Sequence, residues 1–483
     1  MKKSSSICVI IILCVFPCLV KSSVLLEDKE FAGKIQILES WIKAQMEYRS
    51  LPGMAAGIVY DQELIYSKGF GYSNLETKKP VSPETIFRIA SITKAFTAAA
   101  IMQLRDEGRL QLDDPVEKYL KWFKIKHRFP EAPPITIRHL LTHTSGLPRE
   151  SSFPYWTDHK FPTREQMIKA LPEQETIYAA ESKYKYSNLA LALAGEIVSE
   201  VSGITYEEYI TKNILEPLEM NSTIVSIQED EEDLAVPYSQ RLPDGSRKIQ
   251  PFTNSRGITP AANMSSNVVD LAQYISLQFR SGKREGSQIL NGSSLREMHR
   301  VHWLNPSWKS GRGIGFGVWK QDNYTAVGHG GWVAGNRTQI IFIPEETFGV
   351  IVLTNSDDGE PGFFARKILK MILPALKKII SPAPKLRKAD PAWKKYTGLY
   401  EDSGYYRTEV LVIGESLFLN GYSVPPEDDP ESSIKELYPE GPDTFRLSGK
   451  NGNGEIVRFE MDKNGKVKRL WIGANYTLPI SER

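Results

Sequence analysis

The stretch around Ser91 combines two residue types that can carry out nucleophilic chemistry. Ser91 and Lys94 lie three apart, just before an apolar run of small residues at 95–102 that predicts a buried helix. At this spacing two helical side chains share a face, one turn apart. A nearby lysine amine can take the proton of a serine hydroxyl if desolvation lowers the pKa of the amine. The pattern therefore favours an activated serine, with an exposed lysine at a helix start as the alternative.

Other elements must hold this stretch in place, and hydrophobic periodicity predicts several of them. They are a helix over 31–49, a hairpin of strands 54–60 and 63–69, helices over 135–141, 189–201 and 206–215, and strands over 338–343 and 348–354. His143 and Ser145 follow one of these helices without a G-x-S-x-G context, so we assign them to turn stabilisation rather than to a protease site.

Composition limits the classes of function. The 483 residues are enough for two or three domains, and 41% hydrophobic with 24% charged residues is typical of a globular protein. The formal net charge is +2 without a long basic block, which argues against nucleic acid as a partner. The sequence specifies no oligomeric state.

The N-terminus has the pattern of a secretory signal peptide over residues 1–22. Lys2 and Lys3 precede an apolar run, Ile7 to Val20, that is short for a membrane span. We expect cleavage after Ser22 and a secreted protein, extracellular or periplasmic in a bacterium, with no membrane association afterwards. All three cysteines lie inside this segment, so the mature chain would have no disulfide, cysteine nucleophile or cysteine-bound zinc.

Six N-x-S/T sequons exceed the roughly two expected by chance, which indicates a secreted glycoprotein if the source is eukaryotic. The expected glycosylation sites are Asn221, Asn263, Asn291, Asn323 and Asn475. Asn336 is the least favourable sequon, because it follows Gly331 by only five residues.

The C-terminal part has a different composition from the rest. Residues 381–393 are rich in proline and lysine and predict a linker. Short β-like runs separated by Asn-Gly turns follow, so residues 394–483 predict a small all-β barrel or sandwich. Residues 23–380 would form the main domain.

Three separated motifs resemble those of the serine β-lactamase and penicillin-binding-protein family. They are Ser91-x-x-Lys94, Tyr186-Ser187-Asn188 and His329-Gly330-Gly331. The similarity extends over residues 35–370 and is greatest to the branch of class C β-lactamases, D-alanyl-D-alanine carboxypeptidases and esterase-like proteins. It implies an α+β fold, in which an antiparallel sheet flanked by helices meets an all-helical lobe at the site.

The resemblance also implies roles for individual residues. Ser91 would form an acyl-enzyme, while Lys94 and Tyr186 would move protons, either of them serving as the base. Asn188 would orient Lys94 and the acyl amide, and the backbone N–H groups of Ser91 and Trp332 would form the oxyanion hole. No metal or cofactor is implied.

One departure from the family pattern bears on the substrate. Typical β-lactamases have Lys-Thr-Gly where this chain has His329, Gly330 and Gly331. A largely neutral histidine and a glycine offer neither the charge nor the hydroxyl that meet a substrate carboxylate. We therefore expect a small-molecule or peptide substrate cleaved at an ester or amide, such as a D-amino-acid peptide or ester, rather than efficient β-lactam hydrolysis.

Two other functions remain open at this point. One is a secreted, glycosylated extracellular-matrix protein that keeps the fold as a scaffold with little or no catalysis. The other is a penicillin-binding receptor that is acylated but barely deacylates. The presence of Ser91, Lys94 and Tyr186 together argues against the scaffold with a fully decayed site, and does not distinguish the hydrolase from the receptor.

Overall fold

The computed structural model describes residues 25, 28–282, 286–380, 390–404, 406–422, 433–448 and 452–480. The expected signal peptide and residues 381–389 of the expected linker lie outside the described residues. The chain divides into two compact units, residues 1–380 and 381–483.

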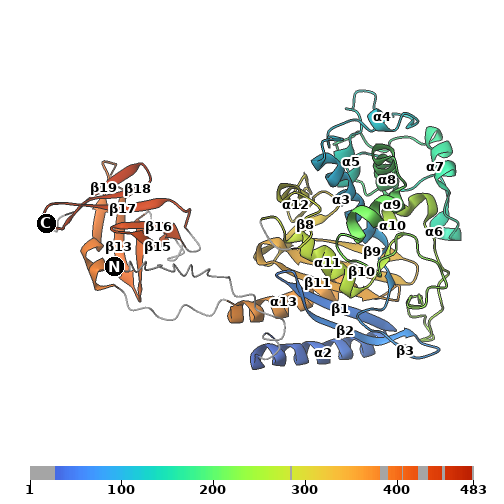
Figure 1. The fold of residues 1–483 in the computed structure, drawn as a ribbon, viewed down its shortest axis with the longest axis horizontal. Coiled ribbons are helices and arrows are strands. Elements are labelled where there is room, and N and C mark those ends of the chain that lie inside the picture. Colours follow the sequence, from blue (N-terminus) through green and yellow to red (C-terminus); the bar gives the residue numbers. More distant parts are fainter. Residues whose placement is uncertain are drawn as a thin grey trace, which may run out of the picture. The chain divides into compact units, whose positions relative to one another are not determined.

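A single antiparallel sheet organises the first unit (Figure 1). In the described residues it contains nine strands in the spatial order β3-β2-β1-β11-β10-β9-β8-β7-β6. Their bounds are β1 Gly53–Tyr60, β2 Glu63–Asn74, β3 Lys79–Pro80, β6 Trp303–Leu304, β7 Ser310–Arg312, β8 Gly317–Gln321, β9 Tyr324–Val333, β10 Asn336–Ile343 and β11 Phe348–Thr354.

Both faces of the sheet are buried at β1 and β11, because these two paired strands are apolar at nearly every position. In β1, Met54, Ala56 and Ile58 join one hydrophobic core, whereas Ala55 and Val59 join the other. This alternation follows from the period of two in a strand. The first core is completed by α2 (Lys29–Arg49) and α13 (Pro361–Ile380), which lie side by side below the sheet in Figure 1.

The opposite face of the sheet packs against the helical lobe, whose central helix is α3 (Thr93–Asp106). The remaining helices among the described residues of the unit are α4 Val116–Tyr119, α5 Ile137–Thr142, α6 Tyr155–Asp158, α7 Arg164–Ala170, α8 Asn188–Ser202, α9 Tyr206–Ile210, α10 Thr259–Ala262, α11 Val268–Gln278 and α12 Gly292–His299. Single-turn segments are η1 Ala90–Ile92, η2 Leu171–Glu173, η3 Thr211–Leu215, η4 Arg256–Ile258 and η5 Pro344–Glu346, and β4 Phe87–Arg88 pairs with β5 Ser265–Ser266.

No single helix among the described residues has the length and apolar content to cross a membrane, although the bent pair of α8 with residues 206–215 meets those criteria together.

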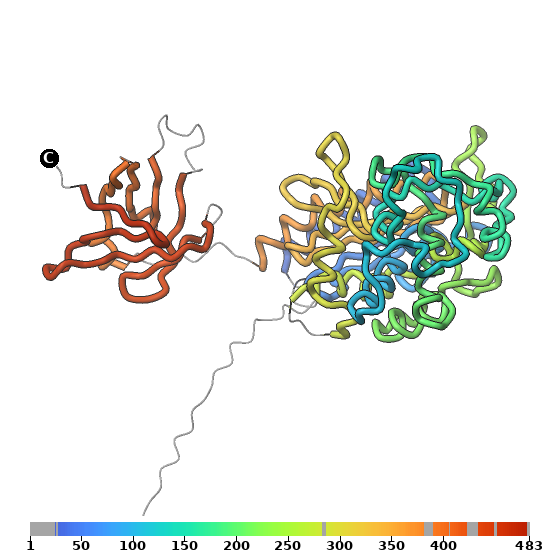
Figure 2. The backbone as a smooth tube through the Cα atoms, turned by 90° about the horizontal axis from the view of Figure 1, so that it is seen from above, coloured from blue at the N-terminus to red at the C-terminus, as the bar shows by residue number. Residues whose placement is uncertain are grey.

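The second unit is a closed antiparallel barrel, orange to red in Figure 2. Its described strands are β12 Gly398–Glu401, β13 Arg407–Ile413, β14 Ser416–Tyr422, β15 Ile434–Gly441, β16 Thr444–Ser448, β17 Ile456–Met461, β18 Val467–Ile472 and β19 Asn475–Pro479. A short helix, η6 (Pro391–Tyr396), precedes them, and its Trp393 packs against Phe445 in the barrel core. The barrel unit therefore begins inside the range expected to be linker. The expected fold class, an α+β domain followed by a small all-β domain, is confirmed.

Candidate active site

Ser91 lies in the single-turn helix η1 that leads into α3, not on α3 itself as the spacing predicted. The preceding residue, Ala90, has a φ of +46°, a conformation that residues with a β carbon seldom adopt. Hydrogen bonds on both sides hold it there, from Ile89 N to Met264 O (3.0 Å) and from Thr93 Oγ1 to Ala90 O (2.6 Å). Backbone strain of this kind is common where a side chain must be presented to a ligand.

Lys94 is fully buried directly beneath Ser91. Its Nζ lies 3.1 Å from Ser91 Oγ, 2.8 Å from Asn188 Oδ1 and 2.7 Å from the carbonyl oxygen of Ala261. Burial holds the pKa of the amine well below its usual 10.5, so the neutral form is favoured. A neutral amine can donate its two hydrogens to the two carbonyl-type oxygens, which leaves its lone pair for the hydroxyl of Ser91.

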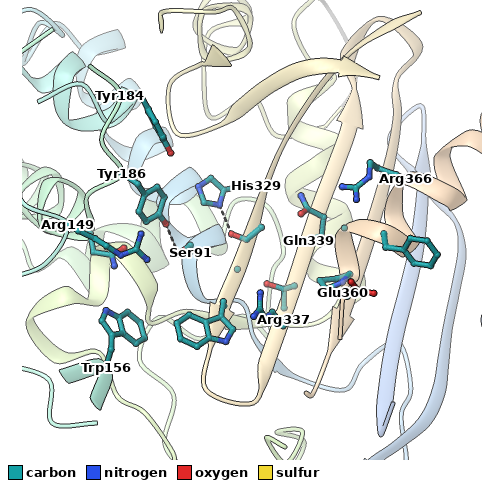
Figure 3. Close-up of a pocket in the computed structure, with 18 residues that line it drawn as sticks. Ser91, Arg149, Trp156, Tyr184, Tyr186, His329, Arg337, Gln339, Glu360 and Arg366 are labelled. Carbon is teal, nitrogen blue, oxygen red and sulfur yellow. Dashed lines mark hydrogen bonds between the residues drawn. The ribbon is translucent and has the colours of Figure 1, made fainter. Parts of the chain in front are cut away.

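The hydroxyl of Tyr186 lies 2.8 Å from Ser91 Oγ (Figure 3), and Lys94 Nζ lies 4.9 Å from the centre of the Tyr186 ring. Burial raises the pKa of this phenol to about 12. The ring packs against His143 at a centroid distance of 4.4 Å. His143 caps the end of α5 with a φ of +59°, and its Nδ1 accepts a hydrogen bond from Ser187 N (3.2 Å). His143 thus stabilises its turn, as expected, and also supports the Tyr186 ring.

Asn188 begins α8, where the side chain of Ser187 caps the helix by accepting from Ala190 N at 2.9 Å. While Asn188 Oδ1 faces Lys94, its Nδ2 lies 2.8 and 3.0 Å from the two carboxylate oxygens of Glu150. The expected contact with Lys94 is therefore present. Glu150 was missed in the sequence because it lies in a loop without periodicity or a family motif.

His329, on β9, forms a wall of the site and is half-buried. Its Nδ1 lies 2.7 Å from the carbonyl oxygen of Gly330, which can only accept, so this nitrogen carries the proton and donates it. Nε2 then carries no proton and can only accept a hydrogen bond. Burial, together with the charges of Lys94 and Arg312, lowers the pKa of His329 to about 3, so the ring is neutral at physiological pH.

Beyond Gly328, the strand that carries His329, β9, has a free edge that faces Ser91. Pairing of β9 with β8 ends at Gly328, whereas pairing with β10 continues to Val333, which closes a two-residue hairpin with Asn336. The closing pair of such a hairpin, here Val333 and Asn336, is hydrogen-bonded, and hydrogen-bonded pairs alternate along the strands with pairs that are not. Trp332 is in the next pair, so its N–H points away from β10 to the open edge. The N–H of Ser91 lies at a helix start, where amides lack intrahelical acceptors.

These groups surround a cavity of about 600 Å³ between the helical lobe and the sheet (Figure 3). Trp156 of α6 stacks on Trp332 of β9 across it, with ring centroids 5.5 Å apart. The cavity is lined by Ser91, Arg149, Trp156, Tyr184, Tyr186, Asn188, His329, Gly330, Gly331, Trp332, Arg337, Thr338, Gln339, Glu360, Pro361, Gly362, Phe363 and Arg366. All eight residues expected in the catalytic and substrate-binding set thus lie in or directly beneath one pocket. No group of three or more potential metal ligands occurs among the described residues.

The structure corrects one expected glycosylation site. Asn263 is buried, its Oδ1 accepts from Arg88 Nη2 (3.0 Å) and Ser255 N (2.8 Å), and its Nδ2 donates to Ser226 Oγ (3.1 Å). A glycan on this nitrogen is incompatible with that packing. Asn336 is also buried. The remaining four sequons, at Asn221, Asn291, Asn323 and Asn475, are exposed.

The beta-lactamase family model matches residues 38–372, most of the chain. This chain belongs to the beta-lactamase family. Curated relatives include Beta-lactamase-like protein 2 of Dictyostelium discoideum, 29% identical over 71% of this chain, and Protein flp of Staphylococcus aureus (strain MRSA252), 27% identical over 66%. The matches cover 63% and 62% of those proteins, so the chain spans less than two thirds of their length.

Three solved structures also resemble this chain. An octameric penicillin-binding protein homologue from Pyrococcus abyssi is 32% identical with a TM-score of 0.63, and the match covers 92% of this chain and 99% of that one. EstCE1, a hydrolase with promiscuous acyltransferase activity, and a D-stereospecific amidohydrolase from Streptomyces share the fold at 23% identity, with TM-scores of 0.60 and 0.57. These two matches cover 72% and 70% of this chain, and 99% and 97% of the others.

Proposed function

We propose that this protein is a secreted serine hydrolase that cleaves an ester or amide through an acyl-enzyme on Ser91. The observation that carries the proposal is the setting of Lys94. Its buried amine faces two oxygen acceptors and the hydroxyl of Ser91, and its lowered pKa favours the neutral form. A neutral amine in this position is a general base for the serine, so we assign Lys94 rather than Tyr186 as the base of acylation.

In the acylation step, Ser91 Oγ would attack the substrate carbonyl carbon as its proton passes to Lys94 Nζ. The negative charge that develops on the carbonyl oxygen would be stabilised by the N–H groups of Ser91 and Trp332. The bond to the leaving group then breaks, and the leaving oxygen or nitrogen takes the proton from the Lys94 ammonium, directly or through the hydroxyl of Tyr186. The products of this step are the acyl-enzyme and a free alcohol or amine.

Deacylation would use the same groups in the reverse sense. A water molecule takes the place of the leaving group and loses a proton toward Tyr186 and Lys94 as it attacks the acyl carbon. Ser91 recovers its proton, and the acid product leaves. With a pKa of about 12, Tyr186 acts in both steps as a protonated hydroxyl that donates and relays, not as a standing phenolate.

His329 favours substrates without a carboxylate next to the bond that is cleaved. The ring is neutral and presents the bare acceptor Nε2, which can receive a hydrogen bond from a hydroxyl or amide but cannot attract an anion. Esters and amides, including peptides and D-amino-acid derivatives, fit this requirement better than β-lactams. The names of two neighbours of the same fold, a hydrolase with acyltransferase activity and a D-stereospecific amidohydrolase, agree with this class.

A scaffold without catalysis is a weaker proposal, because the site carries costs that only chemistry would explain. Burying an amine so that its pKa falls destabilises the folded chain relative to an apolar side chain of the same size. Ala90 adds backbone strain next to the nucleophile. Without a need for catalysis, both features would be removable by single substitutions.

The test is to treat the full chain with an activated ester and to locate the adduct by mass spectrometry. We expect acylation of Ser91 followed by turnover, and no adduct on the Ser91→Ala variant. An adduct that persists without turnover would support the receptor instead. If Ser91→Ala hydrolysed the ester as fast as the wild type, the proposal would be wrong.

The secretion part of the proposal rests on the signal-like N-terminus and the exposed sequons. Expression of the full chain in eukaryotic cells should place it in the medium, beginning near Ser23 and carrying glycans on some of Asn221, Asn291, Asn323 and Asn475. Asn263 and Asn336 should carry none. Retention of the intact N-terminus in the cell, without glycans, would contradict secretion.

A further inference from the structure

The carboxylate of Glu150 connects to the base through one intervening side chain. Its two oxygens lie 2.8 and 3.0 Å from Asn188 Nδ2, and Asn188 Oδ1 in turn lies 2.8 Å from Lys94 Nζ. Asn188 is 2% exposed and the side chain of Glu150 19% exposed, so solvent screens this chain of contacts only weakly. The hydroxyl of Tyr155 also donates to Glu150 and fixes the carboxylate from behind.

A carboxylate decides which way the Asn188 amide faces. An ionised carboxylate only accepts hydrogen bonds, so the amide must turn its nitrogen to Glu150 and its oxygen to Lys94. The flipped amide would present N–H groups to Lys94 and would compete with the hydroxyl of Ser91 for the lone pair of the amine. The orientation that leaves this lone pair to Ser91 is therefore set by Glu150, which itself touches neither the nucleophile nor the base.

We propose that Glu150 is a positioning residue for the base, which holds the Asn188 amide with its oxygen on Lys94, and that Arg149 is its counter-charge. This inference rests on the proposed function. Arg149 Nε lies 3.0 Å from Glu150 Oε1, and its guanidinium lies 5.0 Å from the centre of the Tyr186 ring. Two adjacent residues thus bring opposite charges to the same side of the site.

The two charges act on Lys94 in opposite senses. The Glu150 carboxylate stabilises the ammonium and raises the pKa of Lys94, while the Arg149 guanidinium lowers this pKa. Both effects are smaller than the lowering by burial. Removing one charge and then the other should therefore move the pH dependence of acylation in opposite directions. A residue that merely supported the fold would change the rate or the stability without that reversal.

The two histidines and the tyrosine around Lys94 do not interfere with the interpretation of its pH dependence. His143 and His329 have pKa values lowered by burial, so both are neutral above pH 6.5, and Tyr186 stays protonated up to about pH 12. Arg312 faces both histidines and packs on the ring of Tyr184. These groups therefore keep their charge above pH 6.5 and below about pH 12, so they would not cause a change in rate within that range.

The experiment is the pH profile of Ser91 acylation by an activated neutral ester, followed by intact-protein mass spectrometry in the full chain. The rate should rise with pH as Lys94 loses its proton. In Glu150→Gln this rise should move to lower pH, and in Arg149→Gln to higher pH, each by on the order of half a pH unit. The double variant should return close to the wild-type position, and thermal unfolding of each variant confirms that it is folded.

Glu173→Gln provides the matched control, because Glu173 is an exposed carboxylate of the same lobe whose partner is Lys126. It should leave the profile unchanged. Equal profiles in all variants, or shifts of Glu150→Gln and Arg149→Gln in the same direction, would overturn the inference. If Glu150→Gln does not fold, Arg149→Gln still tests the inference. The side chain of Arg149 is 53% exposed, so we expect this variant to fold, and its pH profile of acylation must move to higher pH. Absence of any acylation in the wild type would instead refute the proposed function.

Discussion

Gly331 of β9 passes directly over the carbonyl group of Ile89, two residues before the nucleophile. A β carbon on Gly331 would lie 2.1 Å from that oxygen and 2.3 Å from Thr338 Oγ1, far inside van der Waals contact. Thr338 Oγ1 also donates to Ile89 O at 3.2 Å. The absence of a side chain therefore lets the strand approach the Ser91 turn closely enough for the N–H of Trp332 to face the site.

We expect Gly331→Ala to push β9 away from the Ser91 turn and to misplace an oxyanion donor. Loss of one such donor typically costs 10²- to 10³-fold in kcat, and we expect a loss of about that size here. The measurement is ester hydrolysis at saturating substrate. Gly330→Ala is the control, because its β carbon would come close only to the movable end of Gln339, at 2.9 Å, and would lie 3.4 Å from the carbonyl oxygen of Thr338. A loss in Gly330→Ala as large as in Gly331→Ala would contradict this account.

Lys94→Met should abolish most of the acylation and leave the fold intact. General base catalysis is typically worth about 10²- to 10⁴-fold, and methionine fills nearly the same volume without a basic nitrogen. Removing a buried amine offsets the two hydrogen bonds lost at Asn188 and Ala261, so we expect a small change in Tm. Adding Tyr186→Phe should cost little more, because the two groups act on the same proton. Fully additive losses in the double variant would argue for separate roles.

Substitution of Trp156 should change the size of the acyl group that the site accepts. Trp156 closes the pocket by stacking on Trp332, so Trp156→Ala opens space beside Ser91. We expect kcat/KM for long-chain esters to rise several-fold relative to acetyl esters, since each methylene placed in an apolar pocket is worth roughly 1 kcal/mol. Trp308→Ala serves as the control, because Trp308 is 79% exposed and does not line the pocket. An unchanged chain-length preference in Trp156→Ala would exclude this part of the pocket as the acyl site.

Acid should destabilise the protein through its buried histidines. Burial lowers the pKa of His299 to about 3, and its Nε2 lies 3.0 Å from Gln278 Oε1. Because the folded-state pKa lies below the unfolded value near 6.5, the unfolded state binds the proton first. The contribution of the neutral ring to the free energy of unfolding is therefore fully present above pH 6.5 and is lost as the pH decreases toward 3. For His299 alone the loss by pH 4.5 should be about 2–3 kcal/mol.

The measurement is the difference in free energy of unfolding between pH 7.5 and pH 4.5, from denaturant titrations. His299→Gln should make this difference smaller by about the amount given above, since glutamine does not titrate. His127→Gln should not, because His127 is exposed. Equal pH dependence in wild type and His299→Gln would show that His299 is not held neutral in the folded state.

The sequence predicted the parts of the site that depend on short-range spacing and on the family resemblance. Ser91 and Lys94 were recognisable because three residues of separation bring their side chains together even across the junction of η1 and α3. The strand pair 338–343 and 348–354 was predicted by apolar runs around a proline turn. The second strand has the predicted bounds, and the first begins two residues earlier, at Asn336. Local patterns suffice where the partners are close in the chain.

Contacts between distant segments could not be predicted in this way. The Trp156–Trp332 stack joins a loop-flanked helix of one lobe to a strand of the other, and neither tryptophan has a local pattern that indicates a partner. Glu150 was missed because a single carboxylate in a loop is usually solvated. The positive φ of Ala90 had no signal either, since glycine is the residue that normally marks such a conformation.

The pairing of β1 with β11 has a consequence for the time at which the protein can work. Met54 pairs with Thr354, 300 positions further along the chain. At a synthesis rate of about 5–20 residues per second, β1 exists for roughly 15 to 60 s before its partner strand has been made. During that interval an eight-residue apolar strand has one edge without its neighbour, which is a hazard for association between nascent chains. The sheet of the hydrolase proposed here can therefore be completed only after residue 354 has been made. A chain that stops before β11 would contain the nucleophile, the base and the tyrosine without the strand that joins β1 to β10.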